Sequence, residues 1–230
     1  MMTRLLGYGS LLLLGTSAFG TFFWAKPDRV QGDAYRILYF HVPLAWVAFL
    51  AFGVVFVASV AYLRTRAARW DRLGRASAEV GVVFTSLVLL TGSIWGQPIW
   101  GTWWSWDPKL TTTLILWFLY LAYLMVRAYA EPPRGPRYAA VLGIVGFVDV
   151  PLVYLSSYWW RTLHPQPAVG PLAANQPSAA IVWLLLFALG AFTVFYVFLV
   201  RLRQEAEELS ERVAEIRARG GAPLPRATPT

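Results

Sequence analysis

Cysteine is absent from the 230 residues of this chain, and histidine occurs only twice. The absence of cysteine excludes disulfide bonds, thiolate metal sites and redox dithiols. Charged residues make up only 14% of the chain, whereas a soluble domain of this size carries about 25%. The composition therefore excludes an ordinary soluble domain and points to an apolar environment.

Hydrophobic residues, at 57% of the chain, gather in long uncharged runs. A membrane-spanning helix needs about 20 such residues. The runs are Leu5 to Ala25, Ile37 to Leu63, Val80 to Trp106, Leu110 to Val126, Tyr138 to Trp160 (interrupted only by Asp149) and a stretch within Pro165 to Val200. We predict an all-α, polytopic membrane bundle of six transmembrane helices over residues 1–200. A cytoplasmic charged helix and a disordered tail are expected over 201–230.

The first run could be mistaken for a cleaved signal peptide, because Arg4 precedes it and small residues interrupt it. It continues through Phe22 and Trp24 without a polar break. This continuity favours a retained helix.

The net charge of +8 is distributed unevenly along the chain. Fifteen of the twenty basic residues lie before the first run, after the last run, or in the second and fourth connections. The other five are Lys26, Arg29, Arg36, Lys109 and Arg161. Because Lys and Arg collect on the cytoplasmic side of membrane proteins, both termini are expected in the cytoplasm, and residues 25–36, 95–110 and 160–177 on the outer face. The basicity reflects topology in a lipid bilayer, and no nucleic-acid partner is expected.

Five of the twelve tryptophans lie between Trp95 and Trp106, immediately before Asp107. An aromatic belt explains single tryptophans at helix ends, but not this density. The cluster is either an interfacial anchor or a flat apolar platform for a flat ligand. Asp107 is expected to cap the following helix, or to orient the loop through a tryptophan N–H or Lys109.

The predicted topology places both histidines on the outer face. His41 lies near the start of the second helix, where Pro43 fits a first turn, and His164 follows the fifth helix. Two neutral imidazoles on opposite sides of a planar macrocycle would hold a six-coordinate haem. The alternative is that both are ordinary interfacial residues, and the residues alone leave both interpretations open.

Residues 95–107 resemble the tryptophan-rich signature of the haem-handling proteins of cytochrome c biogenesis. The segments Phe40-His41-Val42-Pro43 and Trp159 to His164 are also similar to that family. Chain length, six predicted helices and one histidine in each of outer loops one and three resemble the haem-delivery branch, CcmC. The resemblance covers about residues 5–200.

The resemblance implies a protein that is not an enzyme. It would hold haem b on the periplasmic face of the bacterial cytoplasmic (inner) membrane and deliver it to the haem chaperone CcmE. The implied partners also include CcmA, CcmB and CcmD. His41 and His164 would be the axial ligands, and Arg36, Lys109 and Arg161 are candidate propionate partners. The implied haem platform consists of Trp95, Gly96, Trp100, Gly101, Trp103, Trp104, Trp106 and Asp107.

Two positions depart from this pattern. Pro108-Lys109 is more similar to the larger haem-attachment synthetases, and Asp149 stands where an asparagine is expected. Because Pro151 should kink the fifth helix and free the Phe147 carbonyl, Asp149 is expected to donate a hydrogen bond at the kink. A permease that moves haem or another substrate, and a synthetase that attaches haem, remain the alternative functions.

Overall fold

The computed structural model describes residues 2–131, 134–166 and 177–220. Helices account for all of the regular secondary structure within these ranges. Six helical segments are long and apolar enough to cross a membrane. The predicted all-α bundle with six spans is therefore confirmed.

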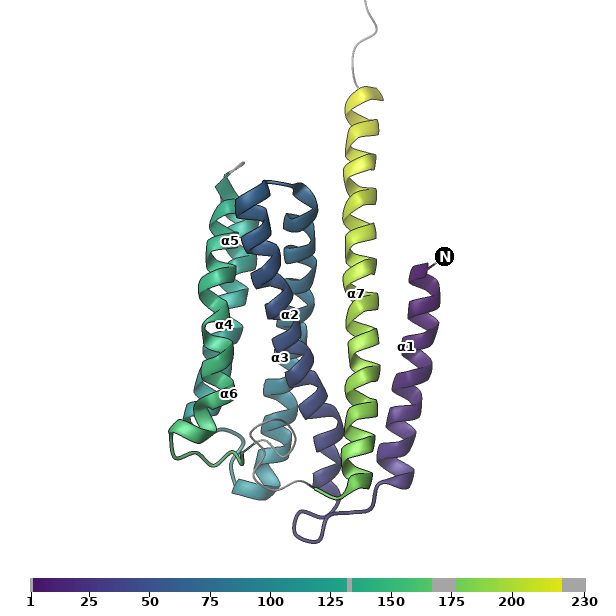
Figure 1. Cartoon of the computed structure of the whole chain (residues 1–230), viewed down its shortest axis with the longest axis vertical. Coiled ribbons are helices and arrows are strands. Elements are labelled where there is room, and N and C mark those ends of the chain that lie inside the picture. The colour runs from purple at the N-terminus through teal and green to yellow at the C-terminus, as the bar shows by residue number, and fades with distance from the viewer. Residues whose placement is uncertain (1, 132–133, 167–176, 221–230) are drawn as a thin grey trace, which may run out of the picture.

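The helices follow one another along the chain with short connections. Their bounds are α1 (Met2–Phe19), the π-helical turn η1 (Gly20–Trp24), the 3-10 turn η2 (Asp33–Ile37), α2 (Leu38–Thr65), α3 (Ala68–Trp100), α4 (Pro108–Tyr129), α5 (Arg134–Phe147), α6 (Asp149–Trp159) and α7 (Ala179–Gly220). The α2–α3 and α4–α5 connections lie at one end of the bundle, which we call the basic end (Figure 1). The opposite end, called the tryptophan end, holds residues 25–37, 101–107 and 160–166.

The third span is shifted from its predicted position at both ends. It begins at Ala68 rather than Val80, so Arg69, Arg72 and Arg75 lie on α3 and not in a loop. Arginine stems can cover apolar surface while their charged heads stay in water, which lets α3 extend past the hydrocarbon. At the other end α3 stops at Trp100.

The core lies around α2, which packs against α3, α5 and α7. The Phe52 ring on α2 stacks on Tyr120 of α4, with centroids 3.7 Å apart. Gly81 on α3 allows this close packing, because a Cβ there would lie 2.6 Å from the Phe52 ring. Small residues let membrane helices approach closely. Here that contact closes the interior of the bundle on the side of the tryptophan end that faces the basic end.

The fifth span is broken between α5 and α6. Val148 separates the two helices, and Pro151 lacks the N–H that would bond to the Phe147 carbonyl. The break itself was expected. Asp149 is buried there, but its Oδ2 has no partner among the described residues. The predicted hydrogen bond from Asp149 to the kink is therefore not made by Oδ2.

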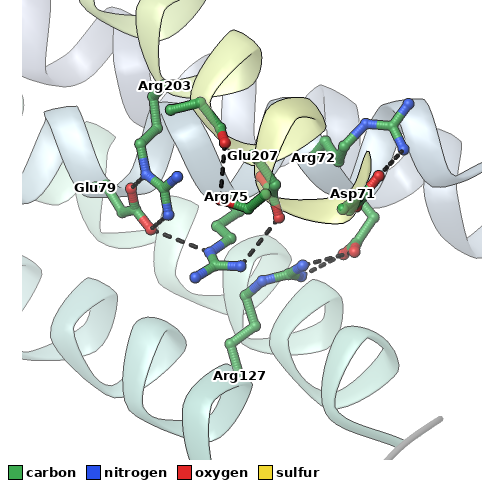
Figure 2. Close-up of polar contacts among 10 residues, drawn as sticks. Asp71, Arg72, Arg75, Glu79, Arg127, Arg203 and Glu207 are labelled. Carbon is green, nitrogen blue, oxygen red and sulfur yellow. Dashed lines mark hydrogen bonds and ion pairs between the residues drawn. The ribbon is translucent and has the colours of Figure 1, made fainter. Parts of the chain in front are cut away.

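Helix α7 continues beyond the bundle at the basic end, beside α1 (Figure 1). The predicted charged helix after residue 201 is therefore a direct extension of the last span, and residues 221–230 lie outside the described residues. Figure 2 shows that α7 joins α3 through Arg203–Glu79 and Arg75–Glu207 ion pairs. Arg127 of α4 pairs with Asp71 of α3 through both carboxylate oxygens.

These ion pairs decide which face of the α7 extension meets the protein. The apolar residues Leu209 and Ile216 of the extension remain exposed, and its glutamate-bearing face packs on α3. Charge complementarity between the α3 arginines and the α7 glutamates explains the choice.

Candidate functional site

The two histidines meet at the tryptophan end although they come from distant parts of the chain. His41 lies in the first turn of α2 and is buried. His164 follows α6 and is half-buried. Their ring centroids are 6.5 Å apart with an interplanar angle of 34°. Neither ring is fully exposed.

Hydrogen bonds fix the tautomer of each imidazole. His41 Nδ1 lies 3.0 Å from Thr91 Oγ1, and that hydroxyl donates its own hydrogen to the Leu87 carbonyl. With its hydrogen on the Leu87 carbonyl, the Thr91 oxygen accepts from His41 Nδ1–H. His164 Nδ1 lies 2.9 Å from the Pro165 carbonyl, which can only accept. Both Nε2 atoms consequently carry a lone pair, and neither has a partner among the described residues.

This arrangement fits two ligands on opposite sides of one metal. Metal–imidazole bonds are about 2 Å long, so such a pair places its nitrogens about 4 Å apart and its centroids about 6 to 6.5 Å apart. Ligating histidines usually donate their other N–H to a carbonyl or similar acceptor, as both rings do here. Within the described ranges no group of three or more His, Asp or Glu side chains could hold a bare metal ion. A macrocycle that brings four ligands of its own fits this donor set.

Both histidines line a cavity of about 400 Å³. This volume falls in the usual range for small-molecule and cofactor sites. Around the histidines the wall is formed by Gln31, Trp95, Gly96, Trp100, Trp104 and Lys109. Trp95 meets His41 edge-on at 5.8 Å, and Trp100 lies 6.2 Å from His164. The part of the cavity nearest the tryptophan end is therefore an aromatic slot with the two imidazoles in its wall.

The tryptophan segment does not form one continuous loop. Residues 95–100 are the last turns of α3, and the helix ends at Gly101, whose φ of +72° is the left-handed C-cap that glycine adopts readily. The expectation of a loop over 95–110 is wrong for this half. Gly96 lies inside the helix and makes room for the Trp100 ring, which lies 2.9 Å from where a Gly96 Cβ would be.

The remaining tryptophans divide between cavity and surface. Trp104 lines the cavity, and its Nε1 is buried without a described partner. Trp103 and Trp106 are 61% and 75% exposed and do not line it. The structure thus brings Trp95, Gly96, Trp100 and Trp104 to the histidines and leaves the other two tryptophans on the outer surface.

Asp107 joins two outer segments. Its Oδ1 accepts from Leu110 N at 2.9 Å, which caps α4 as expected. Its Oδ2 accepts from the Thr162 hydroxyl and from Leu163 N at 3.1 Å. Burial raises the pKa of Asp107, but these hydrogen bonds outweigh it and hold that pKa below its usual value. The carboxylate binds the His164 segment, not the tryptophan N–H or Lys109 suggested by sequence.

The three candidate propionate partners have different surroundings. Lys109 lines the cavity beside the histidines. Arg36 donates to the carbonyls of Phe22 and Ala25, at 2.9 and 3.2 Å. Arg161 is exposed and lies outside the cavity wall. Lys109 is the cation best placed to meet an acidic group inside the cavity.

Sequence reasoning missed four residues of this site. Thr91 holds His41, and Gly92 leaves space for it, since a Cβ there would lie 3.0 Å from the His41 ring. Trp46 and Tyr154 form part of the cavity wall. The polar Thr91-Gly92-Ser93 interruption within an apolar run was the available signal for the first two.

Comparison with known proteins agrees with this geometry. A family model described as CcmC, heme exporter protein C, matches residues 1–219. The chain belongs to the CcmC family. The match reaches further than the 5–200 expected from the signature segments, because it includes most of the α7 extension.

Individual relatives give the same result across bacteria and plants. Heme exporter protein C of Haemophilus influenzae is 36% identical, over 91% of this chain and 86% of its own. That of Bradyrhizobium diazoefficiens is 38% identical, over 84% and 73%. A putative cytochrome c biosynthesis ccmC-like mitochondrial protein of Arabidopsis thaliana is 32% identical, over 94% and 84%.

Proposed function

We propose that this protein binds haem at the tryptophan end of its bundle and delivers it to the haem chaperone CcmE during maturation of c-type cytochromes. The observation that carries the proposal is the His41–His164 pair, with a centroid separation of 6.5 Å and both Nε2 lone pairs directed to no described protein group. Membership of the CcmC family and the printed names of its relatives support haem as the cargo.

Each part of the cavity has a distinct task in this proposal. His41 and His164 would hold the haem iron through their Nε2 atoms, and neither imidazole would have to lose a proton to do so. Trp95, Trp100 and Trp104 provide apolar contact and exclude water from the macrocycle. The ammonium of Lys109 neutralises a propionate. The protein holds haem b reversibly in this mechanism and catalyses no bond change.

The proposed location follows from the charge pattern. The basic end carries most of the arginines, so we place it and both termini in the cytoplasm and the haem site on the periplasmic side of the inner membrane. CcmA, CcmB and CcmD are the proposed companion subunits. Trp103 and Trp106, exposed at the rim, are suitably placed to meet CcmE.

The alternative functions lose their main support. A permease needs a path through the bundle. The cavity reaches no further toward the basic end than Phe49 and Leu116. Between these residues and the basic end, the stacked rings of Phe52 and Tyr120 fill the interior. The synthetase alternative rested on Pro108-Lys109. Pro108 is at the N-terminus of α4, where its missing N–H breaks no bond, and this local role accounts for it.

Absorption spectra of the purified chain, expressed with haem, test the proposal. We expect a low-spin six-coordinate spectrum for the wild type and a five-coordinate or haem-free spectrum for His41→Ala and His164→Ala. Trp183→Ala, an exposed position on α7, is the control. Spectra that are identical in both histidine variants would refute the ligand assignment, and a haem-free wild type would refute the function.

A further inference from the structure

The haem cavity extends from the tryptophan end into the membrane-spanning part of the bundle. Its inner wall is apolar and comes from four helices, with Phe49 on α2, Val88 on α3, Leu116 on α4 and Val153 on α6. An aqueous loop site would not need this depth. The inner wall suits an apolar body that arrives at hydrocarbon level.

Three of the four junctions around this wall are closed by helix packing. Helix α2 packs along α3, α3 against α4, and α4 against α6, whereas no comparable backbone packing joins α2 and α6 in the described residues. The cause is the break at Val148 and Pro151. Helix α5 packs against both α2 and α4, but beyond the break α6 continues along α4. At the α2–α6 junction the cavity is therefore closed by side chains and not by close helix packing.

Two aromatic residues fill that junction. The rings of Trp46 and Tyr154 meet edge to face with centroids 6.0 Å apart, and both line the cavity. Trp46 is also 38% exposed on the outside of the bundle. At 1.5 Å per residue, Trp46 lies about 12 Å along α2 from its start and Tyr154 about 8 Å before the end of α6. With the tryptophan end on the periplasmic side, as proposed above, the pair lies at the depth of the outer-leaflet hydrocarbon.

The Tyr154 hydroxyl is buried at this position and is not satisfied by a hydrogen bond within the described ranges. A buried hydroxyl without a partner is costly, so this conformation is held less firmly than a satisfied one. The opposite rim is held more firmly, because Asp107 fastens Thr162 and Leu163 to α4.

We propose that Trp46 and Tyr154 form a lateral gate through which haem passes from the outer leaflet into the cavity. This inference rests on the proposed function. Haem is flat and largely apolar, so it can slide between two rotating rings with its apolar edge leading. Its carboxylates remain toward the headgroups and Lys109. Transfer to a soluble partner then uses the rim that carries the exposed tryptophans, so uptake and release take different openings.

The cysteine-free sequence allows a direct test. The double variant Trp46→Cys/Tyr154→Cys is purified without haem and joined across the gate by a short cleavable bis-methanethiosulfonate reagent. Haem uptake is then followed by absorption from haem-loaded phosphatidylcholine–phosphatidylglycerol vesicles. Because gating motions set the rate of access, we expect the cross-linked chain to take up haem at least about tenfold more slowly, and cleavage by reductant to restore the rate.

Two controls separate a closed gate from a damaged site. Each single-cysteine variant receives the same reagent and should take up haem no more slowly than before treatment, because a single attachment cannot bridge the junction. Chain cross-linked after loading should retain its six-coordinate spectrum. Trp46→Ala and Tyr154→Ala provide a second, cross-link-free measurement, with faster uptake and faster loss to empty vesicles, whereas Trp183→Ala, an exposed tryptophan outside the cavity wall, leaves both rates unchanged.

The outcomes distinguish the gate from the function. Uptake that is unchanged by cross-linking, or unchanged in both alanine variants, overturns the gate while leaving haem binding intact. A wild-type chain that takes up no haem from vesicles or from solution overturns the proposed function itself.

Discussion

Asp107 and Leu163 are joined by a hydrogen bond of 3.1 Å, although they are 56 positions apart in the chain. Through this bond and its cap on Leu110, one carboxylate connects the start of α4 to the residue that precedes His164. The conspicuous acid after the tryptophans therefore positions the second histidine and is not itself part of the cavity wall.

Replacing Asp107 should release the His164 segment. In Asp107→Ala we expect loss of the α4 cap, at about 0.5 to 2 kcal/mol of stability, and a spectrum shifted from six- to five-coordinate haem. The measurement is absorption together with thermal unfolding in detergent. Thr162→Val removes one of the bonds and should give a smaller spectral change. An Asp107→Ala chain that is destabilised but fully six-coordinate would contradict the positioning role.

Thr91 should be required for firm ligation by His41. Thr91→Val keeps the shape but removes the oxygen that accepts from Nδ1–H, and loss of such an outer partner lowers metal affinity about 10- to 100-fold. A haem titration of the haem-free chain measures this affinity. Thr91→Ser retains the hydroxyl and should bind as the wild type does, so equal weakening in both variants would point to packing instead.

The haem-free chain should keep His164 neutral in mild acid. Burial, followed by the charge of Lys109, lowers the pKa of His164 from 6.5 to about 4. Since the unfolded chain keeps the higher pKa, the folded state loses stability as the pH falls below about 6.5, and the loss is complete near pH 4.

In His41→Ala this residue is the single histidine, so one imidazole NMR signal reports the titration. A midpoint near 6.5 would show that the ring is exposed to water and that the cavity wall is not formed in the haem-free chain.

The Arg127–Asp71 pair should hold α4 to α3 at the basic end. Its side chains are only 10% and 16% exposed, and removing one partner of a buried pair costs about 3 to 5 kcal/mol. We expect Asp71→Asn to lower the thermal midpoint clearly. Glu211→Gln, which breaks the more exposed pair with Arg72, should have little effect. Similar shifts in both variants would mean that the burial does not govern this contact.

The sequence predicted those features correctly that depend on residues within a single segment. The apolar runs predicted six spans, Asp107 before Pro108 predicted the α4 cap, and Pro151 predicted the break after α5. The end of α3 was misjudged because the tryptophan cluster was interpreted as a loop, whereas the helix continues to Trp100 and stops only where Gly101 adopts a positive φ. Spacing gave no indication of the Thr91 contact to His41, since they share no segment.

The sequence by itself determined the membrane class, the number of spans, the presence of both histidines at one end of the bundle and the family signature, because these depend on composition and on residues close together in the chain. Only the tertiary structure decided that the histidines face each other across one cavity, that Asp107 holds the His164 segment and that Trp46 meets Tyr154. Each of these contacts joins separate helices or loops, and their meeting depends on helix packing and on the break that directs α6 along α4.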